Sequence, residues 1–465
     1  MTTKDRLFQN YLRGHSDLPR DFEFSNCPRF SDIVVVPARN EGNFFFKRTL
    51  PSLKKASEKR FEQSGLPVFI CIVANGRVSD SNEEILLQES FLEKFSKPVK
   101  TQMFNWVETS ESFRIGLFNF ISPPFRFEPK QGVGLARKIG CDLAVSLFDR
   151  GLLNSTVVFT TDSDAEVPES YFCWDREILS PGGIAVLPFK HVPDDSQIAP
   201  PEFAALFDSY LENYRLGLLF AASPFAFTAL GSALCINLKT YVQVRGMPKL
   251  LAGEDFYICQ KIAKFSQVFH PRGDPILLQA RFSDRVPFGT GPRMVSWKNF
   301  LDEKGLEKNK ATNFNEICFE NPACFAELKK VRLLLRDLRK NFYRSCDFPI
   351  PLHPRTLEFL STEKILERLK GGLQNKTNAG VFEKLEREIF DGLTEIRLIN
   401  FLGQVEEFKA LPYASALGLF SEMKKNYCEA DDMVLIHKRM VSASSAGMSE
   451  PVGGILPTPA PPIMR

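Results

Sequence analysis

Val157-Val158-Phe159-Thr160-Thr161-Asp162-Ser163-Asp164-Ala165 is the stretch that decides the fold of this chain. Its β-branched and aromatic start predicts a buried strand, which ends in two aspartates separated by one serine. Ligands of open α/β sheets bind beyond the carboxyl ends of the strands. Two carboxylates there can hold Mg²⁺ or Mn²⁺ while a diphosphate completes the coordination. Taken alone, the three residues favour a plain turn or a helix cap, because Asp and Ser are common in both.

The preceding segments repeat this pattern of an apolar run that ends at a polar turn. Residues 32–36 form one such run before Pro37-Ala38-Arg39-Asn40-Glu41, and residues 68–73 form another before Ala74-Asn75-Gly76. A helical stretch over 44–63 lies between them. Apolar runs without alternation are typical of parallel strands covered on both faces. Strand, helix and strand at this spacing predict a right-handed βαβ unit, and therefore an α/β fold with a mostly parallel sheet flanked by helices.

Two further helix starts carry charged residues. The segment Gly132–Gly140 opens a helix with an apolar face repeating every four residues. Arg137 occupies the position of the third glycine of a dinucleotide fingerprint, so we do not expect that kind of site. An arginine so early in the helix can instead reach a phosphate or a base. Later, Glu254 and Asp255 open another helix, where acidic residues also serve as simple caps.

The chain is expected to have four regions. Residues 1–30 are predicted to be an irregular polar leader, 31–300 the α/β domain, 301–440 a mainly helical region and 441–465 a disordered tail. A basic stripe on 325–344 suits either an anionic membrane surface or a solvated helix face.

Composition excludes several classes of protein. A net charge of +3 gives no reason to expect a nucleic-acid partner, and 44% hydrophobic residues with 25% charged ones are ordinary for a globular protein. Ten scattered cysteines without a C-x-x-C pair indicate reduced thiols, and hence a cytoplasmic protein. Residues 216–238 carry no charge, but their internal Pro and Gly predict a helix, a turn and a strand rather than a membrane span.

In their order, these segments resemble the family 2 glycosyltransferases of GT-A fold. The resemblance rests on VVVPARNE, GVGLARKIG, TTDSDA, and LGSALCINLKTYVQVRGMP followed by AGED, within roughly residues 30–290. It implies a GT-A α/β fold and a hexosyltransferase-like enzyme. Nothing resembles the pore-forming helices or the Q-x-x-R-W motif of processive synthases, which favours transfer of single sugars.

The resemblance also implies roles for individual residues. The nucleotide would be bound by Pro37, Ala38, Arg39, Glu41, Asn75, Arg137 and Asp162. Mg²⁺ or Mn²⁺ would be held by Asp162, Asp164 and His270. Asp255, beside Glu254, would be the general base.

The function expected is that of a metal-dependent, inverting glycosyltransferase that moves one sugar from a UDP- or GDP-sugar to a hydroxyl acceptor. The location expected is cytoplasmic, with peripheral contact at the inner membrane face left open. Three alternatives stay open. A retaining transferase is compatible with D-x-D. A nucleotidyltransferase would usually carry a glycine-rich loop that residues 37–40 lack. A catalytically silent scaffold fits poorly with two intact acidic motifs.

Overall fold

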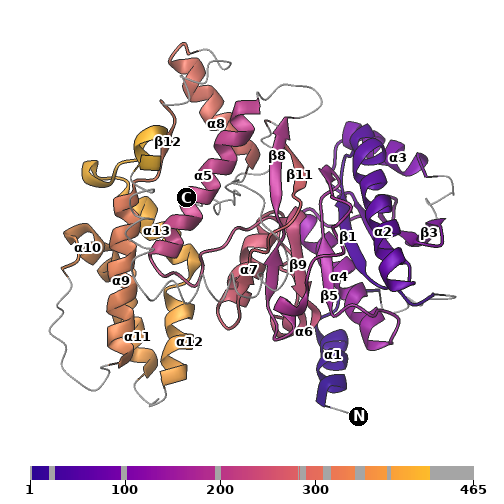
Figure 1. Cartoon of the computed structure of the whole chain (residues 1–465), viewed down its shortest axis with the longest axis horizontal. Coiled ribbons are helices and arrows are strands. Elements are labelled where there is room, and N and C mark those ends of the chain that lie inside the picture. The colour runs from indigo at the N-terminus through magenta and orange to yellow at the C-terminus, as the bar shows by residue number, and fades with distance from the viewer. Residues whose placement is uncertain are drawn as a thin grey trace. The chain divides into compact units, whose positions relative to one another are not determined.

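The computed structural model describes residues 3–19, 27–95, 102–193, 201–280, 282, 290–306, 316–340, 351–373 and 379–418. The chain divides into two compact units (Figure 1). Unit 1 consists of Met1–Val192, Ala229–Ile262 and Ser266–Gln279, and unit 2 of Pro193–Thr228, Ala263–Phe265 and Ala280–Arg465. These boundaries differ from the expected division near residue 300. The tail predicted over 441–465 lies outside the described residues.

Unit 1 is built on an eight-stranded sheet with the order β10-β7-β9-β5-β1-β2-β4-β3. The strands are β1 (Ile33–Ala38), β2 (Val68–Asn75), β3 (Phe104–Thr109), β4 (Phe113–Phe120), β5 (Val157–Thr160), β7 (Ile184–Val186), β9 (Leu234–Asn237) and β10 (Val268–Phe269). The pairs β1–β2, β1–β5, β2–β4 and β7–β10 are parallel, whereas β3–β4, β5–β9 and β7–β9 are antiparallel. The predicted α/β fold with a mostly parallel sheet is confirmed.

A smaller sheet and several helices complete the described part of unit 1. The second sheet has the order β6-β11-β8, with β6 (Ala165–Glu166), β8 (Phe189–Pro193) and β11 (Ile276–Ala280). The helices are α1 (Thr3–Gly14), η1 (Phe45–Thr49), α2 (Leu50–Ser64), α3 (Asn82–Glu93), α4 (Val133–Asp149), η2 (Glu177–Leu179), η3 (Gly231–Ala233), α6 (Leu238–Gln243) and α7 (Glu254–Ala263).

The predicted βαβ unit is present as β1, α2 and β2. All six residues of β1 are buried, because neighbouring side chains point to opposite faces and both faces are covered. On one face α4 packs so closely that a Cβ atom on Gly140 would lie 2.3 Å from a methyl carbon of Val35. Gly65, at φ 64°, ends α2 in the left-handed conformation that glycine adopts without strain. The apolar runs and the glycine at the end of the helix therefore agree with the βαβ unit that the structure contains.

Two elements of unit 1 differ from the expectation. Residues 3–14, expected to be irregular, form α1, and Tyr11 on this helix is only 2% exposed. Its hydroxyl donates a hydrogen bond of 2.6 Å to Asp142 on α4, so the helix is fixed to the domain. The hairpin of β3 and β4 was not predicted, although two aromatic runs flank the turn at residues 110–112.

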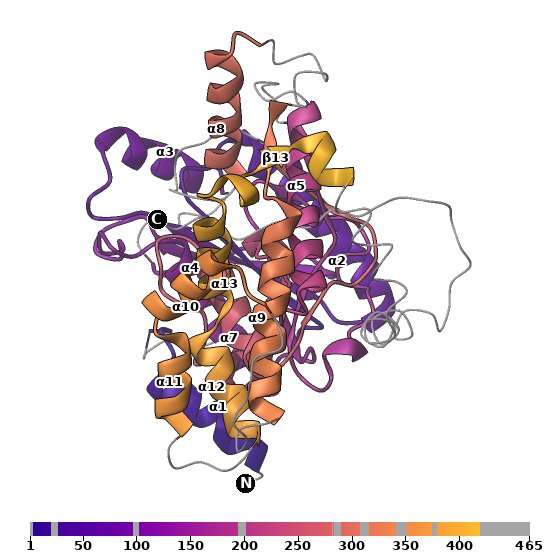
Figure 2. The ribbon, with the colours of Figure 1, turned by 90° about the vertical axis from the view of Figure 1, so that its left-hand side faces the viewer.

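Unit 2 is mainly helical in its described part, as expected for the region after residue 300. It contains α5 (Pro201–Phe220), α8 (Thr290–Glu303), α9 (Pro322–Lys340), α10 (Pro354–Thr362), α11 (Ile365–Leu373), α12 (Ala379–Ile389), α13 (Gly392–Leu402), η5 (Glu406–Phe408) and the short strands β12 (Cys318–Phe319) and β13 (Leu411–Pro412). Helix α9 runs through its middle and packs against α5, α12 and α13 (Figure 2). A Cβ atom on Gly217 of α5 would lie 2.5 Å from the Phe325 ring of α9, so these helices meet closely.

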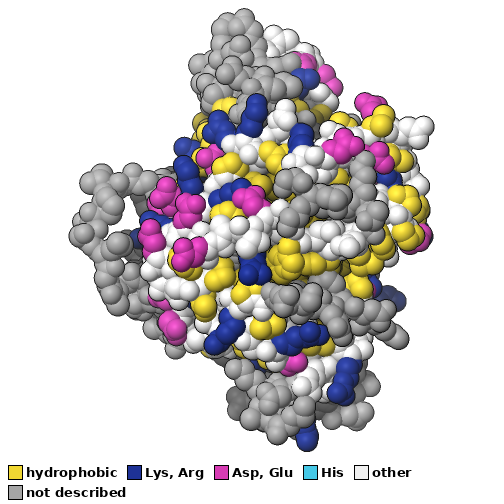
Figure 3. All heavy atoms as spheres, turned by 90° about the vertical axis from the view of Figure 1, so that its right-hand side faces the viewer, with side chains coloured by type: hydrophobic (Ala, Val, Ile, Leu, Met, Phe, Trp, Pro, Cys, Tyr) yellow, Lys and Arg dark blue, Asp and Glu magenta, His cyan; other side chains and the backbone are white. Residues whose placement is uncertain are grey.

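The basic stripe on α9 is not a continuous cationic face. Arg332 points inward and is 6% exposed. Lys329 lies over the ring of Phe220, with its ammonium 4.1 Å from the ring centre, and Lys330 is paired with Glu327. None of the described helices has the length and apolar character needed to span a membrane. Over the face of unit 1 that carries α2 and α3, described Lys and Arg side chains alternate with Asp, Glu and hydrophobic ones (Figure 3).

Candidate active site

The D-x-D loop at the end of β5 is fixed by its backbone neighbours. The N–H of Thr161 donates to Val35 of β1 at 3.0 Å. The hydroxyl of Thr160 donates to the carbonyl of Gly231 at 2.6 Å, and that of Thr49 to the carbonyl of Ser163 at 2.9 Å. Ser163 is therefore buried, while Asp162 and Asp164 on either side of it are half-exposed. The loop presents both carboxylates at the edge of the sheet.

Arg137 of α4 brings the two acidic motifs together. Its side chain is 4% exposed, and its guanidinium forms ion pairs with Asp162 after β5 and with Glu254 at the start of α7. Asp162 lies 25 residues from Arg137 in the chain, and Glu254 lies 117 residues away. Glu254 is 2% exposed and the Asp162 side chain 36% exposed. The guanidinium of Arg137 is therefore held by the buried carboxylate of Glu254 on one side. On the other side it contacts the partly solvated carboxylate of Asp162.

Gly231, at the start of η3, makes room for this arginine. A Cβ atom at this position would lie 2.3–2.5 Å from the guanidinium of Arg137. The N–H of the same glycine donates a hydrogen bond of 2.9 Å to Oδ2 of Asp255. Gly231 therefore contacts Arg137 directly and also holds the carboxylate of Asp255.

Asp255 and Glu254 are neighbours with different surroundings. Asp255 is half-buried and accepts backbone N–H groups from Gly231 and from Phe256, the latter at 2.8 Å. Glu254 is buried and paired with Arg137. The preceding Gly253 has φ +77°, a left-handed conformation that turns the chain into α7. Only Asp255 of the two is accessible to a reacting group, so the pair divides into an accessible carboxylate and a buried one.

The predicted three-ligand metal site is not formed in the described part of the chain. No group of three or more His, Cys, Asp or Glu side chains there could hold a metal ion, so His270 does not join Asp162 and Asp164. The two aspartates still fit a hard divalent cation. Mg²⁺ is usually held by one or two carboxylates together with substrate phosphates, and these are such carboxylates on a half-exposed loop.

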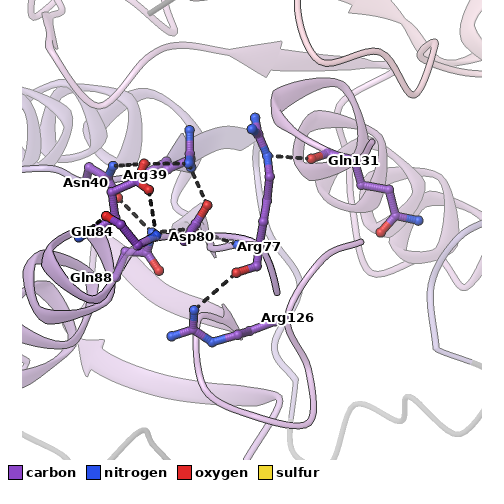
Figure 4. A network of polar contacts seen from close by, with 9 residues as sticks. Arg39, Asn40, Arg77, Asp80, Glu84, Gln88, Arg126 and Gln131 are labelled. Carbon is purple, nitrogen blue, oxygen red and sulfur yellow. Dashed lines mark hydrogen bonds and ion pairs between the residues drawn. The ribbon is translucent and has the colours of Figure 1, made fainter. Parts of the chain in front are cut away.

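A second polar network lies at the ends of β1 and β2 (Figure 4). Arg39, which follows β1, is paired with Asp80 at 2.8 Å and with Glu84 at 2.9 Å. The amide of Gln88 donates to Asp80 at 2.7 Å and to Asn40 at 2.8 Å. Burial alone would raise the pKa of Asp80, but hydrogen bonds from the N–H of Arg77 and from Gln88, together with the charge of Arg39, lower it below its usual range. The Asp80 side chain is thus held as a carboxylate.

The other predicted nucleotide-binding residues lie at the same edge of the sheet, and most of them are buried. Pro37 and Ala38 are buried within β1, and Glu41 is half-buried in the following turn. Asn75 is 2% exposed, and its amide donates to the carbonyl of Ala38 at 3.2 Å. Asn75 therefore joins the ends of β1 and β2.

Comparison with known proteins finds structural likeness alone. No family model and no curated protein matches the chain. The chain is similar to the structure of S. aureus TarS 1-349 in complex with UDP-GlcNAc, at 10% identity and a TM-score of 0.33, over 77% of this chain and 91% of that one. It is also similar to the mannosyltransferase PcManGT from Pyrobaculum calidifontis in complex with GDP-Man and Mn²⁺, at 12% identity and a TM-score of 0.31, over 83% and 93% of the two chains.

Sequence reasoning missed the residues that connect the motifs. Gly231 lies in the LGSALCINL segment, but nothing in the neighbouring sequence predicts its role. Its contact with Arg137 arises only in the folded chain. Asp80 and Glu84 did carry a signal, since Ser81 and Glu84 have the spacing of a capping box, which the structure contains. Their pairing with Arg39 required β1 and β2 to be neighbours.

Proposed function

We propose that this chain is a metal-dependent, inverting glycosyltransferase that transfers a single sugar from a nucleoside-diphosphate sugar to a hydroxyl acceptor. One observation carries the proposal: Arg137 pairs with both Asp162 and Glu254, which gathers the D-x-D and E-D motifs at one edge of the sheet. A guanidinium and an accessible carboxylate are the two groups that such a transfer needs, one for the leaving diphosphate and one for the acceptor proton.

Binding of the donor would centre on Asp162, Asp164 and Arg137. A cation held by the two aspartates would neutralise charge on the leaving diphosphate. The guanidinium of Arg137 could donate hydrogen bonds to phosphate oxygens on the side that faces Asp162, since the Asp162 side chain is partly solvated. Glu254 would keep this guanidinium in place from the buried side.

Transfer would then use Asp255 as the base. The acceptor hydroxyl gives its proton to the free carboxylate lone pairs of Asp255, and its oxygen forms a bond to the anomeric carbon. The bond between that carbon and the phosphate oxygen breaks, and the electron pair leaves with the nucleoside diphosphate. A single displacement of this kind inverts the anomeric configuration. Gly231 and Phe256 hold the base through their N–H groups.

The test is binding and turnover with the full chain. UDP- and GDP-sugars are mixed with the protein in Mn²⁺ or in EDTA, and the melting temperature and release of nucleoside diphosphate are measured. A donor that binds only the folded protein raises the melting temperature, and we expect this rise in Mn²⁺ and not in EDTA.

Matched variants identify the residues responsible. Asp164→Asn should lose the rise in melting temperature, whereas Asp274→Asn, a surface aspartate paired with Ser170, should keep it. A rise of equal size in EDTA would remove the metal from the mechanism, and a product with the donor's own anomeric configuration would establish a retaining transferase. No rise with any donor would overturn the proposed function.

A further inference from the structure

The chain enters α7 through a loop, residues 246–253, that comes directly before the two acidic residues of the E-D motif. Lys249, Leu250 and Leu251 in this entry loop are exposed, so their side chains do not anchor it in the core. The N–H of Gly134 on α4 donates to the carbonyl of Leu250 at 3.1 Å. A Cβ atom on Gly134 would lie 2.4 Å from a carbonyl oxygen of the loop. The middle of the entry loop is therefore held by the start of α4.

The N-terminal segment holds the same loop at two further points. Its helix α1 packs on α4 and α6 (Figure 1). Gly246, at the start of the loop, has φ +78°, and a Cβ atom there would lie 2.2 Å from the hydroxyl oxygen of Tyr11 on α1. Asp17, shortly after the end of α1, pairs its carboxylate with the ammonium of Lys249 at 2.9 Å. Tyr11 thus lies against the backbone where the entry loop begins, and Asp17 binds the middle of the loop.

A buried ion pair on α4 fixes the N-terminal segment itself. Asp142 and Lys138 are 0% and 4% exposed and lie 2.8 Å apart on successive turns of α4. Asp142 accepts the hydroxyl of Tyr11 at 2.6 Å and the N–H of Asp17 at 2.7 Å. Lys138 donates to the hydroxyl of Tyr11 at 2.9 Å and to the carbonyl of His15 at 2.7 Å. Because water cannot replace a bond lost inside this cluster, the cluster holds α1 in one position.

We propose that residues 3–17 are a positioning element for the base: Tyr11 and Asp17 fix the entry loop, and the entry loop fixes the first turn of α7, which carries Asp255. This inference rests on the proposed function. Tyr11 and Asp17 act on the reaction through the loop, so their replacement is expected to change the rate of transfer and not the binding of the donor. A displacement of about 1 Å at the reacting groups can lower a rate about 10²-fold, so small movements of the turn are measurable.

The contacts of the first turn of α7 show how the loop acts on the base. The carbonyl of Gly253, the last residue of the loop, accepts the N–H of Tyr257 at 3.1 Å, so the end of the loop and the turn are bonded together. Within this turn Asp255 accepts the N–H of Gly231 at 2.9 Å, a bond that depends on where the turn lies. The D-x-D loop, in contrast, is held by β1 and η1. A change at α1 should therefore reach the base and leave donor binding unchanged.

The experiment separates turnover from binding in the full chain. Release of nucleoside diphosphate from UDP- and GDP-sugars is measured in Mn²⁺ with water as the acceptor, and calorimetry gives the dissociation constants of UDP and GDP. Water gives a proton to Asp255 and its oxygen bonds to the anomeric carbon, while the bond from that carbon to the phosphate oxygen breaks and its electron pair leaves with the diphosphate. The double variant Tyr11→Phe, Asp17→Asn releases both contacts with the entry loop. We expect its kcat to be about tenfold lower, with both dissociation constants within about twofold of those of the natural protein.

The double variant leaves the buried ion pair intact. Tyr241 also donates to Asp142, at 2.9 Å, and Lys138 keeps its bonds to Asp142 and to the carbonyl of His15. No buried charge loses its only partner, so the variant should stay folded, which its melting temperature checks. Asp17 is half-buried, so Asp17→Asn alone is a milder second variant. Its turnover should fall about threefold, the effect of one partly exposed ion pair.

Two further variants serve as controls. Asp17→Glu in place of Asp17→Asn restores a carboxylate for Lys249 and should recover part of the lost turnover. Phe8→Leu changes the same buried side of α1 away from the loop, because the ring of Phe8 lies 5.2 Å from that of Phe148 near the C-terminal end of α4. This variant should lower the melting temperature and leave turnover unchanged.

The outcomes distinguish this inference from the proposed function. Natural turnover in the folded double variant would overturn the inference and leave the proposed function standing. An equal loss of turnover and affinity would overturn it too, since residues 3–17 would then support the whole site. The same loss of turnover in Phe8→Leu would make α1 a general support of the fold, contrary to the inference. No release of nucleoside diphosphate from any donor by the natural protein would overturn both.

Discussion

Each unit contains a buried arginine between two carboxylates, and the two arginines are bonded differently. In unit 2, Arg332 donates from Nε to Glu395, from Nη1 to Glu386 and from Nη2 to the carbonyl of Phe390. It also lies over the rings of Phe225 and Phe390. Both of its carboxylates have little exposure, 1% for Glu395 and 12% for Glu386.

Arg137 in unit 1 has the same charge pattern with less complete bonding. Its Nε has no partner within the described residues, and the side chain of its partner Asp162 is 36% exposed. A buried arginine with a partner on each of its three nitrogens and buried carboxylates around it is suited to stabilising the fold. One whose partner carboxylate is partly solvated can exchange that partner for a ligand. The comparison therefore separates a structural ion network from one suited to binding.

The largest expected effect is on turnover at the site. Asp255→Asn keeps the size of the side chain and removes its basicity, so turnover should fall by about 10²–10⁴-fold while the affinity for nucleoside diphosphate stays unchanged. Transfer kinetics and calorimetry measure the two quantities. Near-normal turnover would leave Asp255 as a structural link between η3 and α7.

In unit 2 the largest effect should be on stability. Arg332→Met leaves Glu395 buried without its cation, so the free energy of unfolding should fall by about 3–5 kcal/mol, as for other broken buried pairs. Denaturant unfolding followed by circular dichroism measures this. Arg336→Met on the same helix is the control, because that arginine is exposed and its replacement should cost little. If Arg332→Met were as harmless as the control, the network would not be structural.

Replacing one glycine in each unit tests the same difference between the two units, with smaller expected effects. Gly231→Ala places a methyl group against the guanidinium of Arg137, and displacing it should weaken nucleoside diphosphate binding about tenfold, or about 1.4 kcal/mol. Gly217→Ala places one against Phe325 in unit 2 and should instead cost about 1–3 kcal/mol of stability, as overpacked cores do. Calorimetry and thermal unfolding of both variants check this. The same pattern of losses in both would contradict the division into a binding and a structural region.

The smallest expected effects are on the pH dependence of stability, and they have opposite signs. Burial raises the pKa of Glu395 despite its pairing with Arg332, so the stability linked to its ionisation is full below the unfolded pKa of about 4.3 and declines as pH rises through the folded pKa. The pKa of Asp80 is lowered, so its stability is full above the unfolded pKa of about 3.9 and declines as pH falls through the folded pKa. Unfolding of Glu395→Gln and Asp80→Asn across pH 2–7 tests this. Slopes of the same sign relative to the natural protein would contradict it.

Much of the fold of unit 1 could be predicted because its signals are local. The runs at 33–36, 68–73 and 157–159 are apolar without interruption, and each lies in a buried strand. The hairpin of β3 and β4 was not predicted, although its two strands are rich in aromatic residues. The helix at 3–14 was missed because its few apolar residues, such as Phe8 and Tyr11, stand in a polar segment.

The sequence by itself determined that two acidic motifs end up beyond strands or at a helix start, since an apolar run followed by carboxylates is a property of neighbouring residues. Only the tertiary structure decided that Arg137 joins them, that Glu254 is buried while Asp255 is accessible, and that His270 forms no three-ligand metal group with the aspartates among the described residues. These facts depend on which strands become neighbours and on where helices cross them. The contact between Arg137 and Glu254 joins residues 117 positions apart, and no periodic pattern in the sequence predicts it.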